Sequence, residues 1–174
     1  MKLAPLFAFV LALQFTVFAQ QKITVEDIYS GAFRAKGMDE LQALKNTNQY
    51  TVLNYDRSIQ TMQIDLYDFA TLQKVSTLLD TKNQPLLKEG IDSYVFSPNE
   101  KQILLAANSN QIYRHSFTAE YYLYDIAAKT VSKLFDFPVQ EPTFSPDGLQ
   151  LAYAKDNNLF IYNFATKITT QITT

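Results

Sequence analysis

A stretch of sequence that recurs after 48 residues is the feature that most restricts the fold of this chain. VFSPNEKQILLAA at residues 95–107 matches TFSPDGLQLAYAK at residues 143–155 without a gap. In the later copy, Ser-Pro-Asp-Gly at residues 145–148 fits a type I turn between two strands. The earlier copy reads Ser-Pro-Asn-Glu and lacks the glycine. The chain is therefore predicted to repeat a strand-turn-strand unit.

The second half of the unit occurs three times, as LYDFATLQKVSTL from residue 66, LYDIAAKTVSKL from residue 123 and IYNFATKITTQI from residue 161. Short β-branched and aromatic runs separated by polar turns fill the chain from residue 50 onward. Four short strands and a period in the forties are typical of a β-propeller blade. A β-sandwich has a similar density of strands, but it does not require the same turns to recur in register.

The predicted fold class is therefore all-β, a partial β-propeller in residues 49–174. A propeller closes with about four to eight blades, whereas residues 50–174 hold two to three units of this length. The sequence also stops directly after a predicted strand, whose edge a folded domain would normally cover. We expect the chain to be the first part of a larger ring. Assembly of one ring from several copies is the alternative.

The first nineteen residues are predicted to be a secretory signal peptide. Lys2 precedes an apolar run at residues 3–13, and small residues stand at Val17 and Ala19, where signal peptidase reads them. The alternative is a membrane anchor, but Gln14 leaves the run short of the ~20 residues that cross a bilayer. Cysteine is absent, which excludes a lipoprotein anchor. We expect an exported protein, periplasmic or secreted.

Residues 20–48 are predicted to form an N-terminal segment with one short helix. Thr24 and Asp27 have the spacing of a capping box, with Thr24 as the N-cap. The helix is expected to run through Tyr29 and to be ended by the glycines at positions 31 and 37.

Catalytic motifs can be tested by the positions of the four glycines, at residues 31, 37, 90 and 148. No two are four residues apart, as a G-x-S-x-G nucleophile elbow requires, and no two are five apart, as a P-loop requires. With a single histidine and no cysteine, we expect no metal site and no cofactor. The net charge of −2 gives no reason to expect nucleic-acid binding. No catalytic residue is predicted in this chain.

The two best copies of the repeat differ by ten residues, because the offset falls from 48 to 38 after QILLAA. The additional residues lie within NSNQIYRHSFT at 108–118 and should lengthen a loop or a strand pair. Arg114 in this insertion is a candidate binding residue. It could also be a surface residue that pairs with Glu120 or stacks on a tyrosine. For His115, the residues alone favour a hydrogen-bonded strand position.

Several runs resemble the dipeptidyl peptidase IV branch of the prolyl oligopeptidase family. The Arg-His-Ser segment within IYRHSFTAEYYLYD at 112–125 is the most specific. The opening ITVEDIYSGAFRAKGMDEL at 23–41 is similar to the mature start of bacterial members, and YVFSPNEKQILLA and FSPDGLQLAYAKDNNLFIY are similar to their second and third blades. The resemblance extends over the whole mature chain.

The resemblance implies an eight-bladed propeller on an α/β-hydrolase domain, in a serine peptidase that removes dipeptides with Pro or Ala in second place. It implies that Arg114 binds a carbonyl of the bound dipeptide, with His115 as a possible supporting residue. A later pair of glutamates captures the free amine, and a Ser-Asp-His triad performs acyl transfer. The resemblance also implies a homodimer whose contacts include the hydrolase domain.

The chain is therefore expected to be the N-terminal, inactive part of an exported dipeptidyl peptidase. The missing blades, the glutamate pair and the triad would belong to the rest of the enzyme. The alternative is a non-enzymatic exported β-propeller that binds a peptide or a cell-envelope partner.

Overall fold

Strands dominate the computed structural model of the chain, which describes residues 23–33, 41–56 and 58–174. The chain divides into two units, residues 1–37 and 38–174, and each is described by itself. The predicted signal peptide and its cleavage position lie outside the described residues. No helix within the described ranges is both long and apolar enough to cross a bilayer.

The described part of the first unit contains helix α2 (Val25–Ser30). Its N-terminus is the predicted capping box: the Asp27 amide donates to Thr24 Oγ1 at 3.1 Å, and Asp27 Oδ2 accepts from the Thr24 amide at 3.0 Å. The hydrogen bonds that the Asp27 carboxylate accepts from the Thr24 amide and, at 2.8 Å, from the Thr24 hydroxyl lower the pKa of Asp27. Gly31 caps the helix with a φ of 79°, as predicted, and the last helical residue is Ser30, one position beyond the predicted Tyr29. The predicted helix is confirmed.

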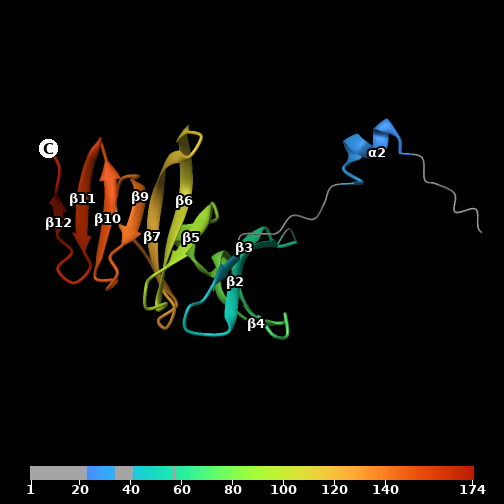
Figure 1. The fold of residues 1–174 in the computed structure, drawn as a ribbon, viewed down its shortest axis with the longest axis horizontal. Helices are drawn as coiled ribbons and strands as arrows, with labels where there is room; N and C mark the ends of the chain where they lie inside the picture. The colour runs from blue at the N-terminus through green and yellow to red at the C-terminus, as the bar shows by residue number, and fades with distance from the viewer. Residues whose placement is uncertain (1–22, 34–40, 57) are drawn as a thin grey trace, which may run out of the picture. The chain divides into compact units, whose positions relative to one another are not determined.

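The second unit consists of three four-stranded antiparallel sheets, each formed by consecutive strands (Figure 1). We call them blades 1, 2 and 3. Blade 1 contains β1 (Leu41–Ala43), β2 (Gln49–Asp56), β3 (Thr61–Asp68) and β4 (Lys74–Asp80). Blade 2 contains β5 (Ser93–Phe96), β6 (Gln102–Tyr113), β7 (Ser116–Asp125) and β8 (Thr130–Lys133). Blade 3 contains β9 (Gln140–Phe144), β10 (Gln150–Lys155), β11 (Asn158–Asn163) and β12 (Thr169–Gln171). The short 3₁₀ helices η2 (Thr81–Asn83) and η3 (Pro85–Leu87) follow blade 1.

These sheets confirm the all-β fold and the partial propeller, with three blades at the upper end of the predicted two to three. One strand lies outside the range 49–174 given to the propeller. Strand β1 pairs with β2, Ala43 opposite Tyr50, and belongs to blade 1. Blade 1 therefore begins at residue 41, where the sequence pattern is too short to indicate a strand.

The 48-residue repeat is reproduced in the turns. Ser97 Oγ accepts from the Gln102 amide at 3.0 Å, and Ser145 Oγ accepts from the Gln150 amide at 2.9 Å. In the later copy Gly148 has a φ of 72°, which a glycine adopts without strain. The same position in the earlier copy is Glu100, at φ 56°.

Glu100 holds this left-handed position with the help of its carboxylate. The carboxylate accepts hydrogen bonds from the amide of Lys45 and, at 2.8 Å, from the side chain of Asn46. These contacts tie the turn of blade 2 to the loop after β1. The missing glycine is therefore compensated by contacts that glycine could not make.

The turns of the second half-repeat also share one device. Asp68 Oδ1 accepts the amides of Ala70 and Thr71 at 3.0 and 2.9 Å, and the side chains of Asp125 and Asn163 accept amides at the equivalent turns. Asp and Asn favour such turns because their short side chains bond the backbone two or three residues later. The conserved spacing in the three runs thus has a local cause.

Alternation along β6 places blade 2 between two hydrophobic cores. Ile103, Leu105 and Ala107 pack in the first core, against blade 1. Leu104 and Ala106 point to the opposite face and pack in the second core, against blade 3. A sheet buried on both faces explains why ILLAA, residues 103–107, is continuously apolar.

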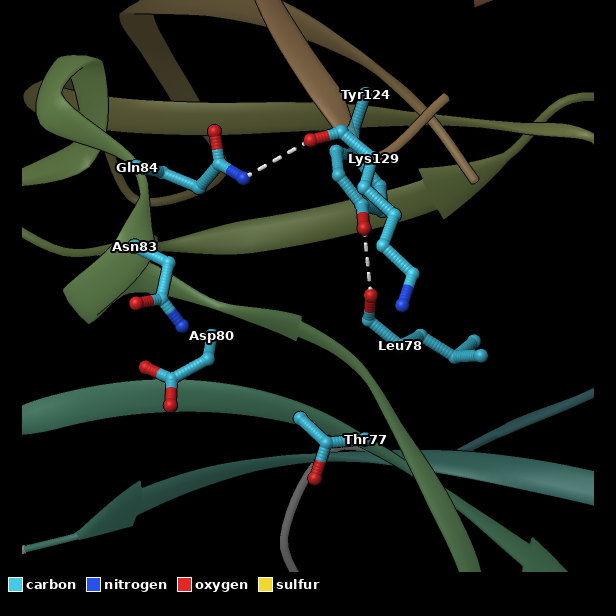
Figure 2. Close-up of a pocket in the computed structure, with 7 residues that line it drawn as sticks. All are labelled: Thr77, Leu78, Asp80, Asn83, Gln84, Tyr124 and Lys129. Carbon is cyan, nitrogen blue, oxygen red and sulfur yellow. Dashed lines mark hydrogen bonds between the residues drawn. The ribbon is translucent and has the colours of Figure 1, made fainter. Parts of the chain in front are cut away.

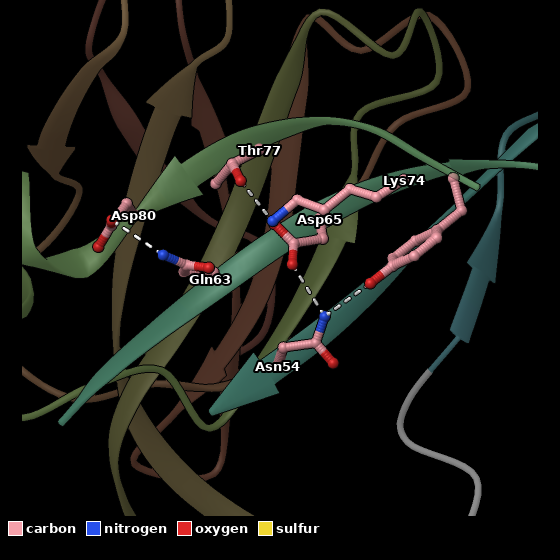
Figure 3. Close-up of polar contacts among 7 residues, drawn as sticks. Asn54, Gln63, Asp65, Lys74, Thr77 and Asp80 are labelled. Carbon is pink, nitrogen blue, oxygen red and sulfur yellow. Dashed lines mark hydrogen bonds and ion pairs between the residues drawn. The ribbon is translucent and has the colours of Figure 1, made fainter. Parts of the chain in front are cut away.

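The face of blade 1 that is turned away from blade 2 carries polar side chains beside the stacked rings of Tyr50 and Tyr67. Asp65 lies on this face, since its neighbour Ile64 packs in the first core. Asp65 is 4% exposed, and its carboxylate accepts from Asn54 Nδ2 at 3.0 Å and Thr77 Oγ1 at 2.7 Å (Figure 3). Lys74 Nζ lies 2.8 Å from Asp65 Oδ1. Pairing and hydrogen bonding are what make a buried carboxylate tolerable.

The corresponding outer face of blade 3 is apolar. Phe160 and Tyr162 of β11 pack toward the second core. Because side chains alternate along a strand, Leu159 faces away from that core. Leu159 is 40% exposed, and Ile168 and Ile172 beside it are 61% and 52% exposed. The two outer faces of the three-blade array therefore differ in chemistry.

Candidate functional site

The residues inserted in the repeat form an arm at one end of blade 2. Strands β6 and β7 pair along their whole length, from Gln102 opposite Asp125 to Tyr113 opposite Ser116. Strand β5 pairs with β6 only as far as Ala106, so residues 108–118, here called the arm, extend past the other strands of the blade (Figure 1). The insertion was expected to lengthen either a loop or a strand pair, and it lengthens the strand pair of β6 and β7.

Two irregularities of pairing redirect the arm, between Ala107 and Asn110 and between Gln111 and Tyr113. Such bulges bend a strand and increase its twist. Asn108 adopts a left-handed φ of 54° at the first bulge. The amide of Ser109 donates to Asp92 Oδ2 at 2.8 Å, which fastens the base of the arm to the segment before β5.

Glu120 organises a polar network at the base of the arm. Its carboxylate accepts from Lys133 Nζ, Asn108 Nδ2 and the Tyr122 hydroxyl, each at 2.9 Å. These hydrogen bonds, that of Lys133 first, lower the pKa of Glu120 to about 2. Burial, followed by the hydrogen bond to Glu120, raises the pKa of Tyr122. The ion pair of Glu120 is therefore formed with Lys133, and Arg114 takes no part in it.

We expect Glu120→Gln to destabilise the chain by about 1 kcal/mol at pH 7, because the ion pair is partly exposed. The carboxyl has a lower pKa in the folded than in the unfolded state, so its contribution is present above pH 4.5 and is lost toward pH 2. Urea unfolding across this range should show the variant and the wild type converging in acid. Glu89→Gln, at an exposed glutamate with no hydrogen-bond partner in the described residues, is the control. If the difference in free energy of unfolding between Glu120→Gln and the wild type stays constant down to pH 2, the charge of Glu120 does not stabilise the chain.

Arg114 occupies the tip of the arm, in the two-residue turn between Tyr113 and Ser116. Its side chain is exposed and makes no hydrogen bond, ion pair or ring contact in the described part of the chain. Five N–H donors in a rigid fork are thus available to an external acceptor. The alternative for Arg114, pairing with Glu120 or stacking on a tyrosine, is not formed among the described residues.

His115 differs from its predicted position. It is the second turn residue, it is exposed, and its side chain has no hydrogen-bond partner among the described residues. The expectation of a hydrogen-bonded strand residue is wrong because the hairpin reverses at this residue. The structure places His115 next to Arg114 in the turn, and no hydrogen bond joins the two described side chains.

A hollow of about 420 Å³ lies between the edge of blade 1 and the β7–β8 turn (Figure 2). Its polar atoms are largely engaged: the Tyr124 hydroxyl donates to the Leu78 carbonyl at 2.7 Å, and Gln84 Nε2 donates to the Lys129 carbonyl at 3.2 Å. Asp80 accepts from Gln63 at 3.0 Å. No sequence pattern indicates this hollow, since its residues come from three separate segments. These contacts join blades 1 and 2 and bring no nucleophile beside a base.

A comparison with protein families decides what the blades belong to. The family described as "Dipeptidyl peptidase IV (DPP IV) N-terminal region" matches residues 97–174, from the first Ser-Pro turn to the end of the chain. The chain carries the N-terminal region of a dipeptidyl peptidase IV-like protein. This finding confirms the resemblance seen in the sequence.

Solved structures agree with the family assignment. Porphyromonas gingivalis dipeptidyl peptidase 4 superimposes on 89% of the dipeptidyl peptidase IV-like chain with a TM-score of 0.75 and 32% identity, and the match covers 22% of that structure. TolB from Acinetobacter baumannii matches 78% of the chain and 33% of its own chain with a TM-score of 0.52 at 17% identity. At that identity the likeness to TolB concerns the fold alone.

Curated relatives match over parts of the dipeptidyl peptidase IV-like chain. A probable dipeptidyl-aminopeptidase B of Emericella nidulans is 33% identical over 81 residues, which are 44% of this chain and 9% of the relative. Dipeptidyl aminopeptidase B of Saccharomyces cerevisiae is 27% identical over 71% of this chain and 14% of its own length. Human prolyl endopeptidase FAP is 26% identical over 80% and 17%. The chain thus spans under a fifth of the length of these relatives.

Proposed function

We propose that these blades are the start of the propeller of an exported serine dipeptidyl peptidase, which removes X-Pro and X-Ala dipeptides from peptide N-termini. The observation that carries the proposal is Arg114, whose guanidinium has no partner among the described residues and lies at the tip of an arm inside the region that matches the family. Relatives named as dipeptidyl aminopeptidases support the class of reaction.

In this proposal the chain binds substrate and another part of the protein performs the chemistry. Arg114 donates hydrogen bonds to a carbonyl oxygen of the N-terminal dipeptide and holds the scissile bond in position. A Ser-His-Asp triad on a hydrolase domain supplies the nucleophile, the base and the group that orients the base. The 174-residue chain by itself is therefore inactive.

The test is dipeptide release by the full-length protein that contains these residues, with Gly-Pro 4-nitroanilide as substrate. The expected result is hydrolysis of this substrate and none of its N-acetylated form, since an exopeptidase of this type recognises the free amine. A well-folded full-length protein that cleaves neither substrate, but binds peptides, would instead support the non-enzymatic propeller.

We also propose that the first nineteen residues direct export and are removed. The charged start, the apolar run and the small residues before position 20 support this. Intact-mass measurement after secretion from a Gram-negative host should give an N-terminus at Gln20 or Gln21. Recovery of the uncleaved protein in the membrane fraction alone would contradict export with cleavage.

A further inference from the structure

A cavity of about 470 Å³ opens at the base of the arm, between blades 2 and 3. It is lined by Ile112 and Thr118 of the arm, by residues 137–140 and by residues 154–157. The two blades are joined beside it, because Ala119 and Val139 exchange backbone hydrogen bonds of 3.0 Å. The cavity therefore has walls from two blades that are fixed to each other.

The walls combine an apolar surface with a neutral rim. Ile112 and Phe137 remain 41% and 37% exposed, although both are large hydrophobic residues. Lys155 Nζ lies 4.9 Å from the centre of the Phe137 ring and pairs with Asp156 at 2.5 Å, so its charge is balanced within the rim. An anionic ligand therefore finds no free cation here, whereas an uncharged apolar side chain finds surface to bury.

Amide groups beside the apolar surface suit a peptide. The side-chain amide of Gln140, half-buried at the start of β9, has no hydrogen-bond partner among the described residues. Asn157 adds a second free amide from the exposed β10–β11 turn. Free amides next to an apolar surface can bond the main chain of a peptide whose side chain enters the cavity.

The position of the cavity connects it with Arg114. Ile112 lies near the end of β6, two residues before Arg114 in the turn, and two residues of extended chain span about 7 Å. A peptide held by Arg114 would reach the cavity within two or three of its own residues. If an enzyme removes the N-terminal dipeptide, every substrate residue beyond that dipeptide belongs to the leaving peptide.

We propose that this cavity is a subsite for an apolar side chain of the leaving peptide, at the third to fifth position of the substrate. The proposal rests on the proposed dipeptidyl peptidase function. It predicts that the enzyme distinguishes peptides by residues that it does not remove.

The test uses the full-length protein and the hexapeptide Gly-Pro-Gly-Gly-Gly-Gly, compared with peptides that carry one leucine at position three, four or five. Burial of one leucine side chain should raise kcat/KM of the best leucine peptide about tenfold over the all-glycine peptide. Phe137→Ala and Ile112→Ala should each reduce this ratio to about threefold or less. Leu86→Ala removes the same kind of side chain from an exposed position of η3, outside the cavity, and should keep the full ratio.

The outcomes separate the two proposals. Equal kcat/KM for leucine and glycine peptides, in a protein that cleaves both and Gly-Pro 4-nitroanilide, would overturn the subsite and leave the peptidase standing. A leucine preference that survives both cavity variants would also overturn it. Failure of the wild type to cleave any of these substrates would overturn the peptidase proposal and the subsite with it.

Discussion

Replacement of Arg114 by alanine in the full-length protein should lower kcat/KM for Gly-Pro 4-nitroanilide by roughly ten- to more than a hundredfold. A hydrogen bond that involves a charged group is worth about 1.5–3 kcal/mol, and this range corresponds to that loss of rate. The contact also positions the scissile bond, so both binding and the transition state should suffer. Stability should not change, because the side chain is exposed and bonds nothing in the described residues.

Two further variants sharpen the test of Arg114. Arg114→Lys keeps the charge but cannot reproduce the fork of donors, so it should recover only part of the activity. His115→Ala removes the neighbouring exposed side chain at the same turn. If Arg114→Ala hydrolyses the substrate as well as the wild type, while a well-folded His115→Ala is inactive, the roles assigned within this turn are wrong.

Leu105→Ala should have the largest effect on stability, a loss of about 2–5 kcal/mol. Leu105 is fully buried in the central strand β6, opposite Tyr94 on one side and Tyr122 on the other. All three pack in the first core, so the cavity left by the substitution lies between two blades that cannot easily close on it. Urea unfolding followed by circular dichroism measures the loss, which is a large share of the ~5–15 kcal/mol typical of a domain.

Leu86→Ala is the matched control for the core, since it deletes the same atoms from a side chain that is 50% exposed. Its effect should stay within about 0.5 kcal/mol. Similar losses for Leu86→Ala and Leu105→Ala would mean that the interface between blades 1 and 2 does not hold the chain together.

The sequence predicted the features that have local causes. The capping box of Thr24 and the Ser97 and Ser145 turns are made by residues within a few positions of one another, so their spacing is visible in the sequence. Strand β1 was missed because three residues, Leu41–Ala43, carry no periodic pattern, and pairing with β2 is what makes them a strand.

The sequence predicted where the candidate site lies, but not whether the side chain of Arg114 is paired. The interrupted repeat located Arg114, and the family resemblance suggested its role. Arg114 could have formed an ion pair with Glu120. The register of β7 with β8 brings Lys133 to Glu120 instead, which leaves Arg114 available. The buried carboxylate of Asp65 could not be foreseen for the same reason, since Asn54 and Thr77 reach it from two other strands.

The unlike outer faces of blades 1 and 3 bear on how such a chain is made. Proteins are synthesised from the N-terminus, so blade 1 appears first. One of its faces is covered by blade 2, and on the other Asp65 is satisfied by contacts within β2, β3 and β4. The buried carboxylate of blade 1 thus does not depend on a segment that is made later. The polar contacts of this outer face can therefore form as soon as β2, β3 and β4 have been synthesised, before blades 2 and 3 exist.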